Sequence, residues 1–238
     1  MGEVGDLRNI VVLTGAGISA ESGLATFRAA DGLWEGHRVE DVATPEAYRR
    51  DPALVHQFYD ARRARLAEVE PNEAHRALAW LDAEWPGQFL LVTQNVDDLH
   101  ERAGSKRLLH MHGELSRGWC LACDGRFAWC GDMGKGAACS SCAVTGKVRP
   151  DIVWFGEMPY EMDRIEAALA SADLFVSIGT SGAVYPAAGF VQSARYHGAS
   201  TLELNLDPSQ TSVFFDEARI GRAGELVPAW VQEILGEG

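Results

Sequence analysis

The chain has 238 residues, 47% of them hydrophobic, which is enough for one large globular domain that carries a small insert. No apolar run approaches the roughly 18 residues of a membrane-spanning helix, and no basic start with an apolar stretch indicates a secretory signal, so a cytoplasmic protein without membrane association is expected. The formal net charge of −13 argues against a nucleic-acid binder and suits partners with basic segments, although acidity can equally serve solubility alone.

Predicted strands and helices alternate along the chain. The predicted elements are a strand at 9–14, a helix at 52–66, a helix from Asn72 to near Glu84, a strand at 88–93, a strand at 151–155, a helix at 163–172, a strand at 174–178 and a last strand at 201–205. Asp51 and Asn72 are suited to cap the first two helices. Such alternation is typical of an α/β fold with a doubly wound, Rossmann-like parallel sheet.

One internal segment differs in composition from the rest. Residues 116–150 are rich in Cys, Gly, Ser and Ala and show little periodicity. We therefore predict a small zinc-binding module at 116–150, inserted into a Rossmann-like domain that is made of 1–115 and 151–238. No internal repeat is found.

The cysteines form the most specific pattern in the chain. Cys120 and Cys123 make one C-x-x-C pair, Cys139 and Cys142 make another, and fifteen residues separate the pairs. Zn²⁺ binds four thiolates tetrahedrally, and a site of four thiolates leaves no position for water. One structural zinc ion is therefore predicted, with Cys130 outside the pattern as a thiol of open role.

A glycine loop follows the first predicted strand. Residues 15–20 fit the pattern G-x-G-x-x-A, which can hold a pyrophosphate, although an ordinary strand–helix turn explains the pattern about as well. A dehydrogenase domain would continue with a regular helix, a second strand and an acidic residue. Instead, 21–34 is a glycine-punctuated segment with Phe27, Arg28 and Trp34, which suits a cover over a bound nucleotide.

Two histidines stand just before the cysteine-rich segment. His110 and His112 are two residues apart, so on a strand they point to opposite faces and only one can face a given cleft. Each could also be an ordinary core or surface histidine. The spacing does not choose between them.

Six short motifs, in one order along the chain, resemble the sirtuins, a family of NAD-dependent protein deacylases. The motifs are Gly15-Ala-Gly-Ile-Ser-Ala-Glu-Ser-Gly23, Thr93-Gln-Asn-Val-Asp97, His112-Gly113, Arg149-Pro-Asp-Ile-Val-Trp-Phe-Gly-Glu157, Gly179-Thr-Ser181 and Asn205. The resemblance covers essentially the whole chain.

The resemblance implies a role for each matching residue. His112 would be the catalytic base, and Val153, Phe155, Gly156 and Glu157 would form the edge against which the acylated peptide lies. The residues implied in NAD⁺ binding are Gly15, Ala16, Gly17, Ile18, Ser19, Ala20, Thr26, Phe27, Arg28, Trp34, Gln94, Asn95, Val96, Asp97, Gly179, Thr180, Ser181, Asn205, Leu206, Asp207 and Ala223.

A further set of residues resembles the class III sirtuins, bacterial ones among them, which remove succinyl and malonyl groups. Tyr59 and Arg62 are three apart on a predicted helix and so share a face, where they could grip a carboxylate. Ala43 would leave room for a longer acyl chain. Without this resemblance, an exposed helix face with Arg62, Arg63 and Arg65 is the default interpretation.

The expected enzyme consumes NAD⁺ and yields nicotinamide, O-acyl-ADP-ribose and free lysine. Its partners would be acylated-lysine proteins or peptides, and a monomer is expected although the oligomeric state stays open. The alternatives are an NAD-dependent oxidoreductase, an ADP-ribosyltransferase and an inactive NAD- or zinc-binding interaction module.

Overall fold

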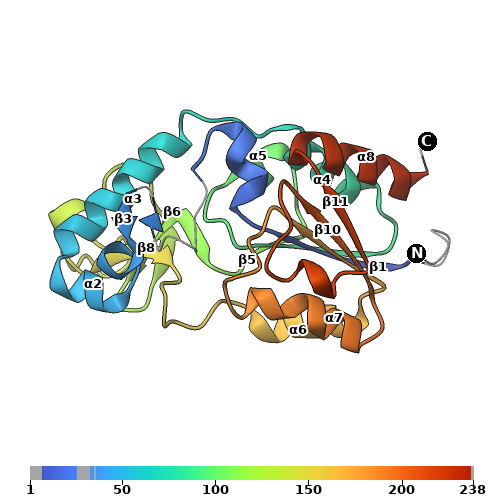
Figure 1. The fold of residues 1–238 in the computed structure, drawn as a ribbon. Helices are drawn as coiled ribbons and strands as arrows, with labels where there is room; N and C mark the ends of the chain where they lie inside the picture. Colours follow the sequence, from blue (N-terminus) through green and yellow to red (C-terminus); the bar gives the residue numbers. More distant parts are fainter. Residues whose placement is uncertain (1–6, 26–32, 35, 237–238) are drawn as a thin grey trace.

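The computed structural model describes residues 7–25, 33–34 and 36–236. Its larger part is a parallel sheet of six strands in the order β11-β10-β9-β1-β4-β5. Figure 1 shows this sheet, with β1, β5, β10 and β11 labelled. The strands are β1 (Asn9–Thr14), β4 (Gln88–Thr93), β5 (Leu108–His110), β9 (Leu174–Ile178), β10 (Ser200–Asn205) and β11 (Glu217–Ile220). The order reverses between β1 and β9, and ligands of such sheets bind where it reverses. The predicted doubly wound fold is confirmed.

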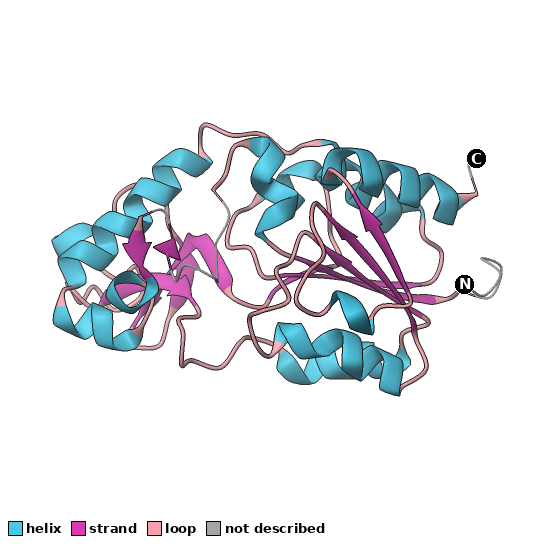
Figure 2. Ribbon diagram, viewed as in Figure 1, coloured by secondary structure: helices cyan, strands magenta, loops and turns pink. Residues whose placement is uncertain are grey.

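Helices cover both faces of this sheet, as Figure 2 shows. α4 (Glu73–Glu84) and α8 (Ala223–Leu235) pack on one face, and α6 (Met162–Ser171) and α7 (Phe190–Tyr196) pack on the other. Side chains along β1 alternate between the two cores, with Val12 in the first and Val11 in the second. Among the described residues, no helix has the length and apolar character needed to cross a membrane.

The caps that the sequence predicts are present. The Asp51 side chain accepts a hydrogen bond from the Leu54 N–H at 3.0 Å and begins α3 (Pro52–Leu66). The Asn72 side chain accepts from the Ala74 N–H at 3.0 Å and begins α4. Short polar side chains satisfy N–H groups that a helix start leaves without partners, so these boundaries are readable from sequence.

A second, smaller sheet holds the cysteine-rich segment. It is antiparallel and contains β7 (Arg126–Ala128), β6 (Gly113–Cys120) and β8 (Val148–Ile152) in that order. Beside it lie α1 (Val39–Val42), α2 (Pro45–Arg50), α3 and the hairpin of β2 (Leu33–Trp34) and β3 (His37–Arg38). Tyr59 of α3 shares a core with Leu115 and Ile152 of this sheet. The domain boundaries at 115/116 and 150/151 stay a prediction.

Two predicted strands need correction. The strand expected at 151–155 lies at Val148–Ile152, because the chain leaves the sheet after Ile152 and turns toward the larger part. An apolar run of this length does not by itself distinguish a strand from a loop that is buried in part. The strand at 201–205 is not the last, since β11 follows it at the edge of the sheet, where alternating exposure weakens the apolar signal. The remaining short elements are η2 (Ala16–Ser22), α5 (Leu99–Ala103), η3 (Gly134–Gly136), η4 (Ala187–Gly189) and η5 (Ser212–Phe214).

Candidate functional site

The loops that follow β1 and β9 meet in direct backbone contact where the strand order reverses. The Gly15 N–H donates to the Ile178 carbonyl at 3.0 Å, and the Gly17 N–H donates to the Gly179 carbonyl at 2.8 Å. A Cβ added at Gly17 would lie 2.7 Å from the Gly179 Cα. Only glycine allows this approach. The loop continues into the 3₁₀ helix η2, which spans Ala16–Ser22 and was not among the predicted elements.

A cavity of about 910 Å³ opens from these loops toward the smaller sheet. This volume suits a ligand of nucleotide size. Of the residues expected to bind NAD⁺ or substrate, its lining contains Gly15, Ala16, Gly17, Ser19, Ala20, Ala43, Tyr59, Arg62, Gln94, Asn95, Val96, Asp97, Val153, Phe155, Gly156, Glu157, Gly179, Thr180, Ser181, Asn205, Leu206, Asp207 and Ala223, together with His112. The carboxyl ends of the strands thus converge on one cavity.

Five of the residues expected to bind NAD⁺ are not in the described lining of the cavity. Ile18 is fully buried in the core under α4 and α8, so its side chain packs away from the cavity. Thr26, Phe27 and Arg28 lie outside the described residues, and so does the side chain of Trp34. Their predicted role in covering a nucleotide stays a prediction.

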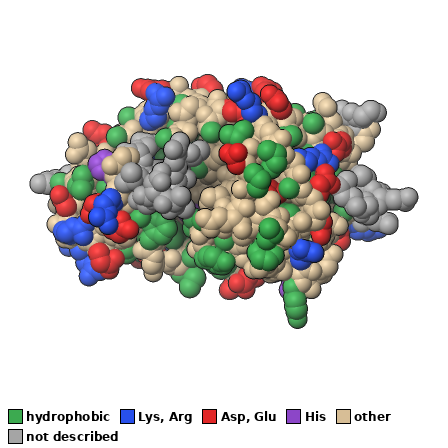
Figure 3. All heavy atoms as spheres, viewed as in Figure 1, with side chains coloured by type: hydrophobic (Ala, Val, Ile, Leu, Met, Phe, Trp, Pro, Cys, Tyr) green, Lys and Arg blue, Asp and Glu red, His purple; other side chains and the backbone are tan. Residues whose placement is uncertain are grey.

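Surface charge gives no sign of a nucleic-acid interface on the face drawn in Figure 3. Among its coloured residues, acidic and basic side chains are scattered over both parts of the molecule. Binding to a polyanion needs lysine and arginine gathered along one surface.

A buried polar network fixes the loop after β4 against the glycine loop. The Asn95 Nδ2 donates to the Gly15 carbonyl at 3.2 Å, and the Ser19 hydroxyl donates to Asp97 Oδ2 at 3.1 Å. Burial raises the pKa of the Asp97 carboxyl to about 6, although the Leu99 N–H and Ser19 stabilise its charged form. These contacts hold the Asn95 and Asp97 side chains in the cavity wall before any ligand arrives.

His112 lies between β5 and β6 and lines the cavity. Its Nδ1 is 3.1 Å from the Gln94 carbonyl oxygen, and a carbonyl only accepts, so Nδ1 carries the proton. The neutral ring therefore keeps its lone pair on Nε2. Burial lowers the pKa of His112 below its ordinary 6.5 and outweighs the bond to Gln94. The imidazole is thus a neutral base at pH 7.

His110 has different surroundings. Its Nδ1 contacts the Asn95 carbonyl at 3.0 Å and its Nε2 contacts Glu101 at 2.6 Å, so both ring nitrogens have protein partners. Burial lowers its pKa, but the hydrogen bond and charge of Glu101 outweigh burial and raise it. Of the two histidines, His112 alone belongs to the described cavity lining.

α3 closes the end of the cavity that faces the smaller sheet. Tyr59 is 0% exposed and Arg62 is 7% exposed. The Arg62 Nη1 donates to the Phe58 carbonyl at 2.6 Å, and its guanidinium lies 3.1 Å from the centre of the Phe58 ring. Arg63 is also buried, and it pairs with Asp60 at 2.7 Å. The alternative of a solvent-exposed arginine face on this helix is therefore wrong for Arg62 and Arg63.

The segment 153–157 forms one rim of the cavity. The Val153 N–H donates to the His112 carbonyl at 2.9 Å, and the Phe155 N–H donates to the Ala43 carbonyl at 3.0 Å. Phe155 is 44% exposed, whereas Trp154 between them is 2% exposed. The sequence reasoning missed Trp154, which lines the cavity beside Tyr59. Its position within the motif that ends at Glu157 was the available signal.

The four paired cysteines gather at the far end of the smaller sheet. Their sulfur atoms all lie within 4.8 Å of one another, with Cys120 Sγ 3.8 Å from Cys142 Sγ and Cys123 Sγ 3.7 Å from Cys139 Sγ. Zinc–sulfur bonds of about 2.3 Å in a tetrahedron place the sulfurs about 3.8 Å apart, so the set fits one zinc ion. Cys130 is exposed and lies outside the cluster.

Removing zinc is expected to unfold the smaller sheet and to lower activity indirectly. The core around Cys120, Met133 and Val148 is small, and a structural zinc site supplies much of the folding free energy of such modules. Chelation, or Cys139→Ser, is expected to release one zinc per chain and to lower the melting temperature. Elemental analysis and calorimetry measure both effects. Cys130→Ser is the matched control and is expected to retain zinc, and full activity of zinc-free protein would contradict a structural ion.

Comparisons with known proteins agree on one family. Residues 15–186 match the model of the Sir2 family. A protein of Bdellovibrio bacteriovorus named NAD-dependent protein deacylase is 58% identical over 96% of this chain and 97% of its own length. A mutant Sir2 homologue solved with ADP-ribose has a TM-score of 0.90 at 36% identity, covering 98% of this chain and 94% of that one. A structure titled Sir2–p53 peptide–NAD⁺ has a TM-score of 0.82 at 25% identity, covering 99% and 96%.

Proposed function

This chain belongs to the Sir2 family, and from this premise we infer that it is an NAD-dependent protein-lysine deacylase. The reaction consumes NAD⁺ and releases nicotinamide, O-acyl-ADP-ribose and free lysine. When bound, NAD⁺ supplies the ribose that receives the acyl group. The observation that carries the proposal is the neutral imidazole of His112, held by Gln94 in the wall of a cavity of nucleotide size.

We assign His112 the role of general base. With its Nδ1 proton donated to the Gln94 carbonyl, Nε2 is the atom that takes a proton from a ribose hydroxyl. The ring cannot rotate without losing this bond, so the accepting nitrogen stays aimed. Burial that keeps the ring neutral also excludes water from the reacting groups.

Different parts of the cavity lining would hold the two halves of NAD⁺. Backbone amides of the glycine loop suit the phosphates, because N–H groups at a tight loop bind anions without side-chain charge. Asn95 and Asp97 suit the nicotinamide ribose beside His112, and Asn205, Leu206, Asp207 and Ala223 suit the adenosine half. These assignments follow from position in one continuous lining.

Activity is expected to fall as the pH is lowered through the titration of His112. Its pKa lies below 6.5, and an imidazolium cannot accept a proton, so kcat/KM is expected to be level near pH 7 and to fall at lower pH. Asp97, with a pKa of about 6, titrates on the same side. A pH profile of kcat/KM measures this fall in activity on the acidic side. In Asp97→Asn the fall in kcat/KM at low pH is expected to remain. A wild-type profile without such a fall would contradict His112 as the base.

We further propose that the enzyme accepts acidic acyl groups, such as succinyl and malonyl. The guanidinium of Arg62 and the phenol of Tyr59 line the closed end of the cavity, where an acyl chain carried on lysine would end. A cation and a neutral donor there complement a carboxylate. Ala43, 3% exposed in the same wall, has a small side chain that leaves room for a longer acyl group.

The acylated lysine would arrive as part of an extended peptide along segment 153–157. Phe155 and Gly156 are both exposed at this rim, so a peptide could lie along it as an added strand. The net charge of −13 favours basic peptides at long range.

One assay separates this function from its alternatives. The protein is incubated with NAD⁺ and matched acetyl-, malonyl- and succinyl-lysine peptides, and products are identified by chromatography with mass spectrometry. Nicotinamide, free lysine peptide and O-acyl-ADP-ribose are expected, without NADH absorbance. Absorbance of NADH would indicate an oxidoreductase. ADP-ribose attached to protein would indicate an ADP-ribosyltransferase, and the absence of any turnover would indicate an inactive binding module.

A further inference from the structure

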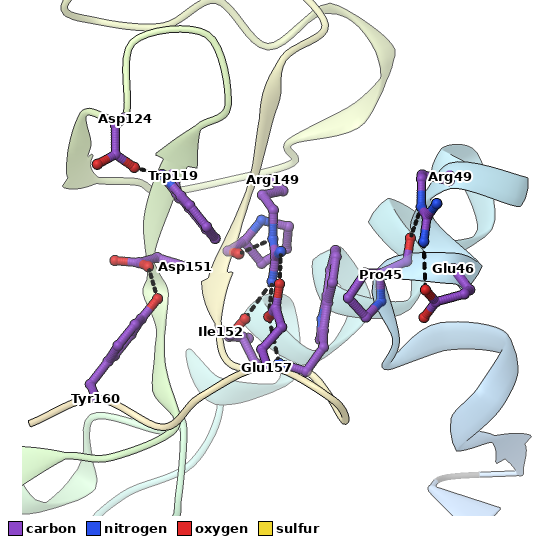
Figure 4. A network of polar contacts seen from close by, with 12 residues as sticks. Pro45, Glu46, Arg49, Trp119, Asp124, Arg149, Asp151, Ile152, Glu157 and Tyr160 are labelled. Carbon is purple, nitrogen blue, oxygen red and sulfur yellow. Dashed lines mark hydrogen bonds and ion pairs between the residues drawn. The ribbon is translucent and has the colours of Figure 1, made fainter. Parts of the chain in front are cut away.

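A partly buried ion pair between Arg149 and Glu157 stabilises the segment that forms the cavity rim. Arg149, 3% exposed, donates from Nη1 and Nη2 to the two carboxylate oxygens of Glu157 at 2.6 and 2.9 Å, as Figure 4 shows. Nη2 also donates to the Ile152 carbonyl at 2.6 Å. A guanidinium that binds both ends of the six-residue turn 152–157 fixes its shape.

Trp154 lies within the turn that Arg149 and Glu157 close, and it contacts both residues. The Trp154 N–H donates to Glu157 Oε2 at 2.9 Å, and the Arg149 guanidinium lies 3.3 Å from the centre of the indole ring. The Tyr48 ring contacts the indole with ring centres 5.3 Å apart. The backbone and the ring of Trp154 are therefore both held, and the ring has one orientation.

Held this way, the indole reaches the acyl end of the cavity. Its Nε1–H donates to the Tyr59 hydroxyl oxygen at 3.0 Å. An indole nitrogen only donates, so the phenol oxygen must accept this bond, and its own hydrogen must point elsewhere. Burial raises the pKa of Tyr59, so the phenol stays protonated and remains a donor at neutral pH.

We propose that Trp154 is a positioning residue for acyl selectivity: its indole N–H turns the Tyr59 phenol into a donor aimed at the carboxylate of an acidic acyl group. Were the indole absent, the hydroxyl could rotate and accept from other donors, and its bond to the acyl carboxylate would lose direction. The inference rests on the proposed preference for acidic acyl groups. In this inference Trp154 acts through the Tyr59 hydroxyl rather than on the acyl carboxylate itself.

The test replaces the N–H and keeps an aromatic ring. In Trp154→Phe, KM for a succinyl-lysine peptide is expected to rise roughly threefold to tenfold more than KM for the matched acetyl-lysine peptide, the scale of one lost neutral hydrogen bond. The effect is expected in KM rather than kcat, because the lost bond acts on substrate binding. Using both peptides on one preparation cancels any loss of folded enzyme.

Two further variants sharpen the result. Trp119 also lies beside Arg149, at 4.9 Å from its guanidinium, but its Nε1–H donates to Asp124. Trp119→Phe is therefore the matched control and is expected to leave the ratio of the two KM values as in the wild type. Tyr59→Phe is expected to raise the succinyl KM, and adding Trp154→Phe to it is expected to change the ratio little further, because the indole acts through the phenol.

Each outcome decides the matter. The inference would be overturned if Trp154→Phe changed KM equally for both peptides. It would also be overturned if the effects of Trp154→Phe and Tyr59→Phe on the KM ratio were fully additive. Neither result would contradict the proposed preference for acidic acyl groups. A wild-type enzyme that removes acetyl but not succinyl would overturn the proposed preference itself, and the inference with it. The wild-type comparison therefore comes first.

Discussion

Replacing His112 by alanine is expected to lower kcat by roughly 10²–10⁴-fold, the usual contribution of a positioned general base. No other described histidine can replace it, because His112 is the one histidine in the described lining of the cavity. Single-turnover rates with an acetyl-lysine peptide and NAD⁺ measure the loss.

Binding of NAD⁺ is expected to be largely retained in His112→Ala, because the glycine loop and Asn95 supply the contacts proposed for it. Fluorescence or calorimetric titration checks this, and the exposed His197 gives a matched control in His197→Ala. Deacylation by His112→Ala at the wild-type rate would contradict the assignment of His112 as the base. Loss of NAD⁺ binding in proportion to rate would give His112 a binding role instead.

Replacing Arg62 by methionine is expected to impair desuccinylation roughly tenfold to a hundredfold more than deacetylation. A charge-assisted hydrogen bond to a carboxylate contributes about 1.5–3 kcal/mol. An acetyl group has no carboxylate, so deacetylation does not lose this contribution. The Arg62 guanidinium lies over the Phe58 ring. Methionine is unbranched and flexible, so it can fill the space beside this ring with an apolar group. The ratio of kcat/KM for succinyl- and acetyl-lysine peptides measures the effect.

Two comparisons isolate the guanidinium of Arg62. Arg62→Lys keeps the charge but not the planar fork, so a smaller loss with the succinyl peptide is expected. Arg76→Met removes an exposed arginine of α4 that pairs with Glu73 at 3.0 Å, and it is expected to leave the ratio as in the wild type. Equal losses on both acyl peptides in Arg62→Met would mean that Arg62 supports the fold rather than choosing the acyl group.

Local patterns in the sequence correctly predicted much of the larger sheet. The strands at 9–14, 88–93 and 174–178 have the predicted bounds, because a strand buried on both faces has a continuous apolar run that ends at polar residues or glycine. Helix 52–66 also has its predicted bounds, since Asp51 and Pro52 mark its start. The spacing of the cysteines was sufficient to predict their cluster.

Prediction failed where neighbouring residues carry no signal of what they pack against. The run from Ile152 to Phe155 is apolar enough for a strand, yet the chain leaves the sheet there because Arg149 and Glu157 close it into a turn. β11 is an edge strand with alternating exposure, and an edge strand has the weakest apolar pattern in a sheet.

By itself, the sequence determined the doubly wound fold, the cysteine cluster and the set of strand ends that carry the polar residues of the cavity. These features depend on residues close together in the chain, through periodicity, capping and spacing. Only the tertiary structure decided that His112 rather than His110 lines the cavity, that Arg62 is buried, and that Trp154 touches Tyr59. Each of these depends on contacts between segments far apart in the chain, such as Gln94 with His112 or α3 with the turn after β8, and no local pattern records which distant group a side chain will meet.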